Sequence, residues 1–539
     1  MEKLNTMKQR ILNFNLESFI VNLWKKIPTI EKKAFLWIFI LSNLVFLFHS
    51  VTFFWGDHDW REVVKRGEAS FRIGRFFAGF PLLPFNKDIL PIFNNLYSFC
   101  GFSLAVIYLA KYWKASRTVF SYTIFGLFII LMPYTLSWMW YIYMTPNFWL
   151  LFFIFYGLYQ VQRDKIRNHL LLIALIFISL SCFQSIISTI LIVFLGKCLL
   201  NVVIEDISFK TLIKENYKVG FDILVASVGY LGTFLYLKYI GKVESIDYHS
   251  QFITLSDLKS QVIKAFIAIR DEFWLASPYM SVWLKRILFI TIMGAFFFCV
   301  RYKNMKKTSV SLSIIIGILL CSQITPFLSG EINFFRYMRI NFYAFPYIYA
   351  LSCVILLSQK QIFKSITLGV MIFATFYSAL GDIRCQKVWY FSRGAEIRTY
   401  QEVIARIHVL PNFNSDKKYK VVLMGKIVLP RYFDRYNENA KNKVGEFNAS
   451  FTSVTFLSFL NFMNGKKYIA RYILSAKFTD KDILSLDTNY ISNQAKPWPH
   501  KDSVAIIGDT IYIIMDKEEL KRVQKRMKKL IKEQTQNKS

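Results

Sequence analysis

The chain has 539 residues, of which 54% are hydrophobic and 18% aromatic, and it carries a formal net charge of +32. In a soluble protein this charge would indicate nucleic-acid binding. Here the apolar residues gather in runs of about 15 to 22, the length that spans a bilayer core of about 30 Å. Much of the positive charge lies in short loops between these runs. The composition therefore predicts a multi-pass membrane protein and excludes a nucleic-acid partner.

Residues 1–33 are polar and amphipathic, which predicts an interfacial segment on the cytoplasmic side. Eleven transmembrane helices are expected between residues 34 and 380. Their expected ranges are 34–55, 89–110, 118–136, 146–160, 168–182, 185–203, 219–240, 286–300, 308–326, 342–358 and 363–380. The fourth is short enough to be re-entrant, and the fifth and sixth form a tight hairpin.

Loops rich in Lys and Arg, such as 111–117, 163–167 and 301–307, alternate with loops that lack this enrichment. Positive loops stay in the cytoplasm, so the N-terminus is predicted to be cytoplasmic. An odd number of spans then places everything after residue 380 outside.

Two of the predicted outer loops, 56–88 and 241–285, carry residues at helical spacing. In the second, Ser256 is placed to cap a helix, and an apolar stripe follows from Leu258 to Phe273. We expect both loops to hold helices that lie on the membrane surface.

Residues 381–539 have shorter apolar runs. KVVLM (420–424) predicts a strand, and VAIIGDTIYIIM (504–515) predicts a hairpin that turns at Gly508 and Asp509. A helix is expected over 450–463, and a basic helix over 521–532. The fold class is thus a polytopic α-helical membrane protein with a small C-terminal α/β domain outside the cytoplasm.

Two carboxylates, Asp57 and Asp59, directly follow the first predicted span, beside His58 and Arg61. A carboxylate at a membrane exit can act as a general base that takes a proton from an attacking hydroxyl. In the alternative interpretation, Asp59 caps the following surface helix and Asp57 is merely solvated.

Four arginines recur near span ends on the predicted outer side: Arg61, Arg75, Arg336 and Arg339. An arginine binds phosphate through a bidentate fork, and a lipid headgroup is the natural phosphate at this depth. A general attraction to anionic lipid is the alternative for any one of them. As a group beside two aspartates, they favour a phospholipid-like substrate.

Aromatic residues crowd the second outer loop, where Trp138, Trp140 and Tyr141 are candidates to stack on a sugar. An interfacial aromatic belt is the other interpretation of the same run. Glu331, in the fifth outer loop, is a candidate acid or a solvated surface residue. The seven cysteines and six histidines show no metal-ligand spacing, so no metal centre is predicted. No cofactor is indicated, and a divalent cation beside the carboxylates stays open.

The run GDHDWREVVKRGEASFRIGRFF (56–77), followed by PIFNNLY in the next span, resembles bacterial O-antigen-modifying (Gtr-type) glucosyltransferases. These belong to the C-type (GT-C) superfamily of integral-membrane glycosyltransferases. The residues that carry the resemblance are Asp57, Arg61, Gly67, Gly74, Arg75 and Phe76. His58 stands where the family has a second adjacent aspartate, so either Asp57 or Asp59 is the base.

The resemblance implies a bacterial inner-membrane enzyme that takes a hexose, often glucose, from a polyprenyl-phosphate carrier on the periplasmic face. It passes the sugar to a lipid-linked polysaccharide such as O-antigen, by an inverting displacement. In this scheme Asp57 and Asp59 are catalytic, and the four arginines bind the donor phosphate. The sugar or acceptor would contact Trp138, Trp140, Tyr141, Glu331 and His58.

Two rival functions are a flippase or transporter of lipid-linked glycan, and another polymerase or ligase of envelope polysaccharide. A transporter should place ionisable residues within its spans. Here most charges lie at span ends, with Asp222 in the seventh span as an exception. The pattern therefore favours the transferase.

Overall fold

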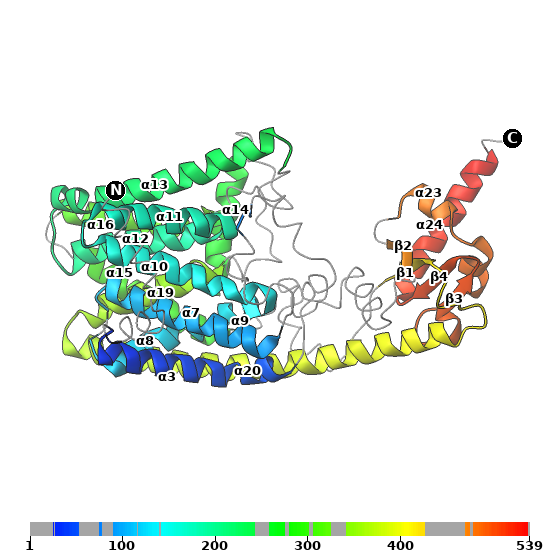
Figure 1. Cartoon of the computed structure of the whole chain (residues 1–539), viewed down its shortest axis with the longest axis horizontal. Helices are drawn as coiled ribbons and strands as arrows, with labels where there is room; N and C mark the ends of the chain where they lie inside the picture. The colour runs from blue at the N-terminus through cyan, green and yellow to red at the C-terminus, as the bar shows by residue number, and fades with distance from the viewer. Residues whose placement is uncertain are drawn as a thin grey trace, which may run out of the picture.

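The structure is a computed structural model that describes residues 25, 27–52, 75–77, 90–115, 117–139, 142–242, 258–274, 280–300, 305–324, 341–425, 469–474 and 478–536. It consists of a helical bundle and a smaller unit built on a sheet. One long helix, α20 (Gln361–His408), belongs to the bundle and continues beyond it to the sheet (Figure 1).

The bundle is formed mainly by long helices that run alongside one another (Figure 1). Its elements are α3 (Thr29–Val45), α4 (Leu47–Val51), α7 (Pro91–Tyr112), α8 (Val119–Ile130), α9 (Pro133–Met139), the 3₁₀ helix η2 (Ile142–Asn147), α10 (Phe148–Val161), α11 (Ile166–Cys182), α12 (Ile186–Val203), α13 (Phe209–Tyr239), α14 (Leu258–Trp274), α15 (Val282–Val300), α16 (Met305–Ser322), α19 (Phe345–Leu357) and α20.

Within the described ranges, six helices are long and apolar enough to cross a membrane, or seven if the bent pair α8 and α9 is one span. The six are α7, α12, α13, α15, α16 and the 361–387 part of α20. Helices α11 and α19 are apolar but shorter. The chain is therefore mostly helical with several candidate spans, as expected of a polytopic membrane protein, and the count of eleven stays a prediction.

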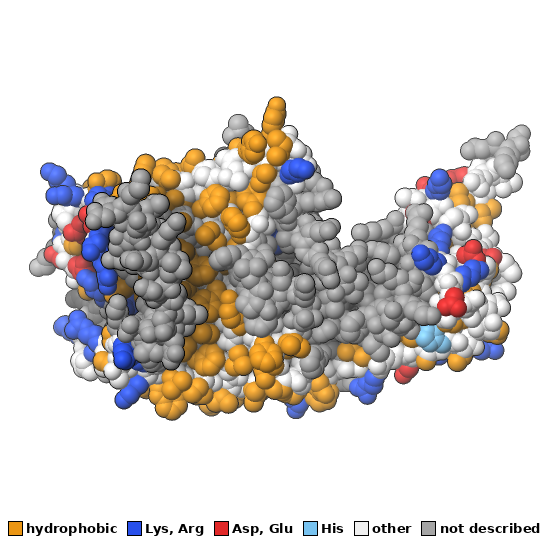
Figure 2. Space-filling view, in the orientation of Figure 1, with side chains coloured by type: hydrophobic (Ala, Val, Ile, Leu, Met, Phe, Trp, Pro, Cys, Tyr) orange, Lys and Arg blue, Asp and Glu red, His pale blue; other side chains and the backbone are white. Residues whose placement is uncertain are grey.

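Exposed apolar side chains line the long helices of the bundle, and Figure 2 shows patches of them in orange between the grey atoms. On α13, for example, Phe221 is 61% exposed and Leu224 is 58% exposed. Water disfavours such a surface by about 25 cal/mol per Å² of apolar area. Lipid does not, so these helices have the surface that a bilayer requires.

Two of the expected spans are interrupted. Helices α8 and α9 are bent by 57° at Pro133, which begins α9. A proline has no N–H to continue the ladder of α8, and it disfavours helical geometry in the preceding residue. The bend therefore falls in the third expected span rather than in the fourth. The first expected span breaks at Phe46, between α3 and α4.

Helix α14 lies within the predicted outer loop 241–285, and its apolar side chains are divided between the bundle and the outer surface, with Phe273 buried and Phe266 exposed. Ile263 and Phe266 are 51% and 61% exposed, whereas Ala268 and Glu272 are buried. The face that packs on the bundle thus combines apolar Phe273 with charged Glu272. Such an arrangement suits a helix beside lipid, although its placement on a membrane surface stays a prediction.

The C-terminal unit contains a four-stranded sheet in the order β2-β1-β4-β3. Its strands are β1 (Tyr419–Met424), β2 (Ile469–Leu474), β3 (Val504–Ile507) and β4 (Thr510–Ile514). Strand β1 is parallel to β2 and β4, and β3 pairs antiparallel with β4. The predicted strand and hairpin are confirmed, and Gly508 takes the positive φ of +59° that the tight turn requires.

Both faces of this sheet are covered, because successive residues of a strand point to opposite sides. Val421 and Leu423 pack with the end of α20, around Val403 and Ile407. Val422 and Met424 face the other side. That side is covered by α23 (Asp480–Leu484), the π-helical turn η7 (Tyr490–Gln494) and α24 (Lys517–Gln536). A 3₁₀ turn, η8 (Lys501–Ser503), leads into β3.

Helix α24 includes the basic helix predicted over 521–532. The helix predicted over 450–463 and most of the 1–33 segment lie outside the described residues. Since α20 runs unbroken across residue 381, no change of element marks the predicted domain boundary. The location of this unit outside the cytoplasm stays a prediction.

Candidate functional site

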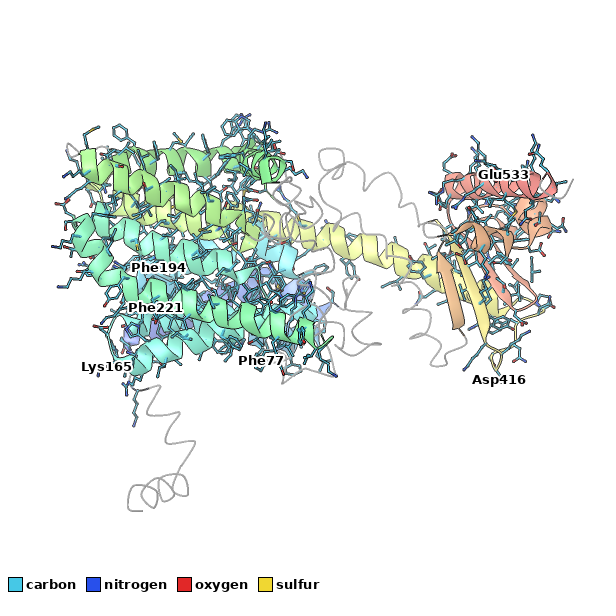
Figure 3. The ribbon with its side chains drawn as sticks, turned by 90° about the horizontal axis from the view of Figure 1, so that it is seen from above. Phe77, Lys165, Phe194, Phe221, Asp416 and Glu533 are labelled. Atoms are coloured by element: carbon cyan, nitrogen blue, oxygen red, sulfur yellow. The ribbon has the colours of Figure 1, made fainter. Side chains whose placement is uncertain are left out.

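The end of the bundle from which α20 continues is here called the exit end. Helices α9 and α14 lie there in Figure 1. Phe77 also lies at this end, whereas Lys165 lies at the opposite one (Figure 3). Of the predicted site residues, the structure describes Arg75 and Trp138. The others are outside the described ranges and their roles stay predictions: Asp57, His58, Asp59, Arg61, Trp140, Tyr141, Glu331, Arg336 and Arg339.

Residues 75–77 of the first outer loop are held against the C-terminal end of α11 and the turn that follows it. The backbone N–H of Phe77 donates to the carbonyl of Ser181 at 3.0 Å. The Cys182 thiol donates to the carbonyl of Phe77 at 2.9 Å. The Phe76 ring lies 5.8 Å from that of Tyr230 on α13. This strip of the loop is therefore held against the exit end through both its backbone and its side chains.

Arg75 is the only described residue among the four predicted phosphate-binding arginines. Its Nε donates to Gln184 Oε1 at 3.3 Å, and its guanidinium carbon lies 4.7 Å from the centre of the Phe183 ring. Gln184 Nε2 in turn donates to the Tyr230 hydroxyl at 3.0 Å. A half-buried cation is thus seated on an aromatic face at the predicted outer surface.

The Phe183 ring connects Arg75 to Trp138. Trp138 meets it edge-on with ring centres 5.0 Å apart, and Tyr343 stacks on it at 5.4 Å. Two residues predicted separately as phosphate-binding and sugar-binding therefore contact the same ring. Trp138 itself is 1% exposed, so its faces are filled by protein in this conformation. A direct sugar contact by Trp138 stays a prediction.

A buried polar network near the start of α19 was missed by the sequence analysis. Glu272 of α14 is 0% exposed, and it accepts hydrogen bonds from the Tyr134 hydroxyl and from Asn341 Nδ2, the latter at 2.8 Å. Lys285 of α15, also buried, has its Nζ 3.5 Å from Glu272 Oε1. Asn341 follows directly after the segment that carries Arg336 and Arg339, so Glu272 ties α14 to the base of that segment.

A second buried network joins α4, α7 and α20. Gln386 accepts from the backbone N–H of His49 at 3.0 Å and donates to the carbonyl of Val45 at 3.0 Å. Asn95 Nδ2 lies 3.1 Å from His49 Nδ1. Asp382, one turn before Gln386, is also buried. These side chains fix the region where the chain enters the loop that holds Asp57 and Asp59.

Within the ranges that the structure describes, no group of three or more His, Cys, Asp or Glu side chains is placed to hold a metal ion. Asp57, Asp59 and Glu331 lie outside those ranges. The described groups at the exit end offer a cation, aromatic rings and hydrogen-bonding side chains. Such a set can bind an anionic, sugar-bearing ligand.

Residues 57–357 match the family model described as Glucosyl transferase GtrII. The match covers more than half of the chain and ends at Leu357, the last residue of α19. No curated protein and no solved structure matches the chain. The contacts of Arg75, Trp138 and Glu272 described above all lie within the matched residues.

Proposed function

The chain belongs to the GtrII family of glucosyltransferases, and we propose that it transfers glucose from a polyprenyl-phosphate carrier to a lipid-linked polysaccharide such as O-antigen. The reaction takes place at the exit end, on the periplasmic face of the bacterial inner membrane. This assigns the chain to the GT-C type of membrane glycosyltransferase.

One observation carries the choice of a lipid-phosphate donor. Arg75, from the first outer loop, is seated on Phe183 at a surface flanked by exposed apolar helices. A guanidinium in this position suits a phosphodiester whose lipid tail stays in the bilayer. A donor anchored in the bilayer brings its phosphate to the depth of this cation. The site therefore favours an amphipathic donor.

The proposed chemistry is a single displacement at the anomeric carbon of glucose. Asp57 or Asp59 takes the proton of the acceptor hydroxyl while its oxygen forms a bond to that carbon. The bond between the anomeric carbon and the phosphate oxygen breaks, and polyprenyl phosphate leaves with the electron pair. Arg75, Arg61, Arg336 and Arg339 stabilise the charge that develops on the leaving phosphate. Configuration at the anomeric carbon is inverted.

Family membership favours this transfer over a flippase or transporter of lipid-linked glycan. The ionisable residue in the seventh expected span also has a partner. Asp222 Oδ2 lies 2.6 Å from His169 Nδ1, in a contact that joins α13 to α11. It therefore has a packing role that requires no transport pathway.

The donor is tested with purified protein in proteoliposomes that contain lipid-linked polysaccharide acceptor. Radiolabelled polyprenyl-phosphate-glucose and radiolabelled UDP-glucose are supplied in separate reactions. We expect label to enter the polysaccharide only from the lipid donor, with release of one polyprenyl phosphate for each glucose transferred. Transfer from UDP-glucose alone, in the absence of polyprenyl phosphate, would contradict the proposal.

A further inference from the structure

The turn between α11 and α12 supports Arg75 from two directions. Phe183 lies under the plane of the guanidinium, and Gln184 accepts the hydrogen bond from Nε. The backbone bonds of Phe77 to Ser181, and of the Cys182 thiol to Phe77, hold the adjacent strip of loop. Arg75 is therefore held at its Nε and on one face, and the backbone of Phe77, two residues later, is bonded to the bundle.

The orientation of the Gln184 amide is determined by its two neighbours. Arg75 Nε can only donate, so it requires the amide oxygen. The amide nitrogen then points to the Tyr230 hydroxyl, which accepts its hydrogen bond at 3.0 Å. Tyr230 lies on α13 and is 7% exposed. A rotated amide would place two donors together at Arg75, so the pair of contacts selects one arrangement.

These contacts leave the outer edge of the guanidinium available. Nε is used by Gln184, and the two Nη groups meet no acceptor among the described residues. The two Nη groups form the end-on fork of an arginine, whose parallel N–H bonds match two oxygens of a phosphate. Arg75 is only partly buried in the described structure.

We propose that Gln184 and Tyr230 are positioning residues that hold the Arg75 fork ready for the phosphate of the lipid donor. The inference rests on the proposed function and deepens it, because it assigns how one phosphate-binding arginine is oriented. A free arginine has to give up rotamer freedom when it binds. A guanidinium that is already stacked and hydrogen-bonded gives up less, so the donor binds more tightly.

The test compares the steady-state kinetics of glucosyl transfer in four single variants. Gln184→Leu and Tyr230→Phe should each raise the KM for polyprenyl-phosphate-glucose by about three- to tenfold, as for the loss of one hydrogen bond. The KM for the acceptor should change less than twofold, and kcat should fall by no more than the donor KM rises, because Arg75 also stabilises the leaving phosphate. Gln162→Leu and Tyr112→Phe, at the opposite end of the bundle, are the matched controls and should leave the donor KM unchanged.

A double variant separates a role through Arg75 from a general structural role. Arg75→Lys keeps the charge but loses the fork and the Nε bond, and should raise the donor KM by about tenfold or more. Adding Gln184→Leu to Arg75→Lys should then produce no further change, because Gln184 acts through Arg75. Independent, multiplicative effects on the donor KM would overturn the proposal.

The outcomes also distinguish this inference from the proposed function. If the wild-type protein does not use the lipid donor at all, the proposed function fails. If the wild-type protein uses it and Gln184→Leu leaves the donor KM unchanged, only the positioning role fails. The positioning role would also be overturned if Gln184→Leu lowered kcat, raised the acceptor KM and lowered the unfolding temperature to a similar extent.

Discussion

The two ends of the bundle are held together in different ways. At the exit end, Glu272 and Lys285 are paired in the interior, with hydrogen bonds from neighbouring helices. At the opposite end, several ion pairs reach the surface, and the His169–Asp222 and Lys111–Glu31 pairs are largely buried. Lys114 Nζ is 2.7 Å from Glu205, and the Lys114 side chain is 67% exposed. Lys218 pairs with the exposed Asp164 at 2.8 Å.

This difference indicates that side-chain geometry is more tightly constrained around Glu272 and Lys285 at the exit end. A buried charge is costly unless every partner is in place. An exposed ion pair contributes at most about 1 kcal/mol and tolerates change. The exit end therefore carries its polar networks at a cost in stability, which is typical of a region that positions functional groups.

The largest expected effect is on catalysis. Either Asp57→Asn or Asp59→Asn removes the general base. That variant should lower the rate of glucosyl transfer by about 10²- to 10⁴-fold, because no carboxylate then takes the proton of the acceptor hydroxyl. Asp164→Asn and Asp206→Asn, at the opposite end, are matched carboxylate controls and should retain transfer. Full activity in both Asp57→Asn and Asp59→Asn would refute the catalytic assignment.

The next effect is on stability at the exit end. Lys285→Met removes the buried partner of Glu272 and should lower the free energy of unfolding by about 3–5 kcal/mol. Thermal unfolding in detergent measures this loss. Lys307→Met, which breaks the exposed pair with Asp206, should cost less than about 1 kcal/mol. The double variant Glu272→Leu with Lys285→Met should recover part of the loss, and equal losses for Lys285→Met and Lys307→Met would contradict the comparison.

A smaller loss is expected from the network of α4, α7 and α20. Gln386→Leu leaves the His49 N–H and the Val45 carbonyl without their side-chain partner, and should lower the free energy of unfolding by about 1–3 kcal/mol. Gln359→Leu is the matched glutamine in the turn before α20. Its contacts are local, so its unfolding temperature should stay near the wild-type value. A larger loss for Gln359→Leu than for Gln386→Leu would reverse the predicted order.

The smallest effect concerns pH at the opposite end. Burial opposes ionisation of Glu205, yet the Lys114 hydrogen bond and the charges of Lys197 and Lys114 hold the pKa of this carboxyl below its ordinary value of 4.5. A depressed folded-state pKa stabilises the fold above the unfolded-state pKa, and that stabilisation is lost as the pH falls through the folded-state value. Below pH 4.5 the unfolding temperature should therefore fall less steeply with pH in Glu205→Gln than in the wild type. The corresponding difference in the free energy of unfolding should be under about 1 kcal/mol. Identical pH profiles would exclude this contribution.

The sequence was sufficient for features that depend on local patterns. The tight α11–α12 hairpin, the strand at 420–424 and the turn at Gly508 all follow from short runs of residues. The resemblance at 56–77 led to the family that the match over 57–357 confirms. Each of these features is determined by residues that are adjacent in the sequence, so no contact between distant residues had to be known.

Contacts between distant residues were not predictable in this way. Arg75 and Gln184 are 109 residues apart, and Tyr134 and Glu272 are 138 apart. Gln184, in a very short turn, has no periodicity that would indicate its partner. In α14, the apolar stripe predicts an amphipathic helix, but a stripe does not tell lipid from protein. Phe273 of this stripe is buried beside the charged Glu272, whereas Phe266 is exposed.

The proposed transfer on the periplasmic face requires that the exit end faces away from the cytoplasm. Because α20 runs unbroken from that end to the C-terminal sheet, alkaline phosphatase fused after residue 539 reports the side directly. We predict high phosphatase activity in intact cells. A second fusion, of green fluorescent protein at the same position, should not fluoresce, because the protein would be exported unfolded. An inactive phosphatase together with a fluorescent fusion would place the exit end in the cytoplasm and contradict the account.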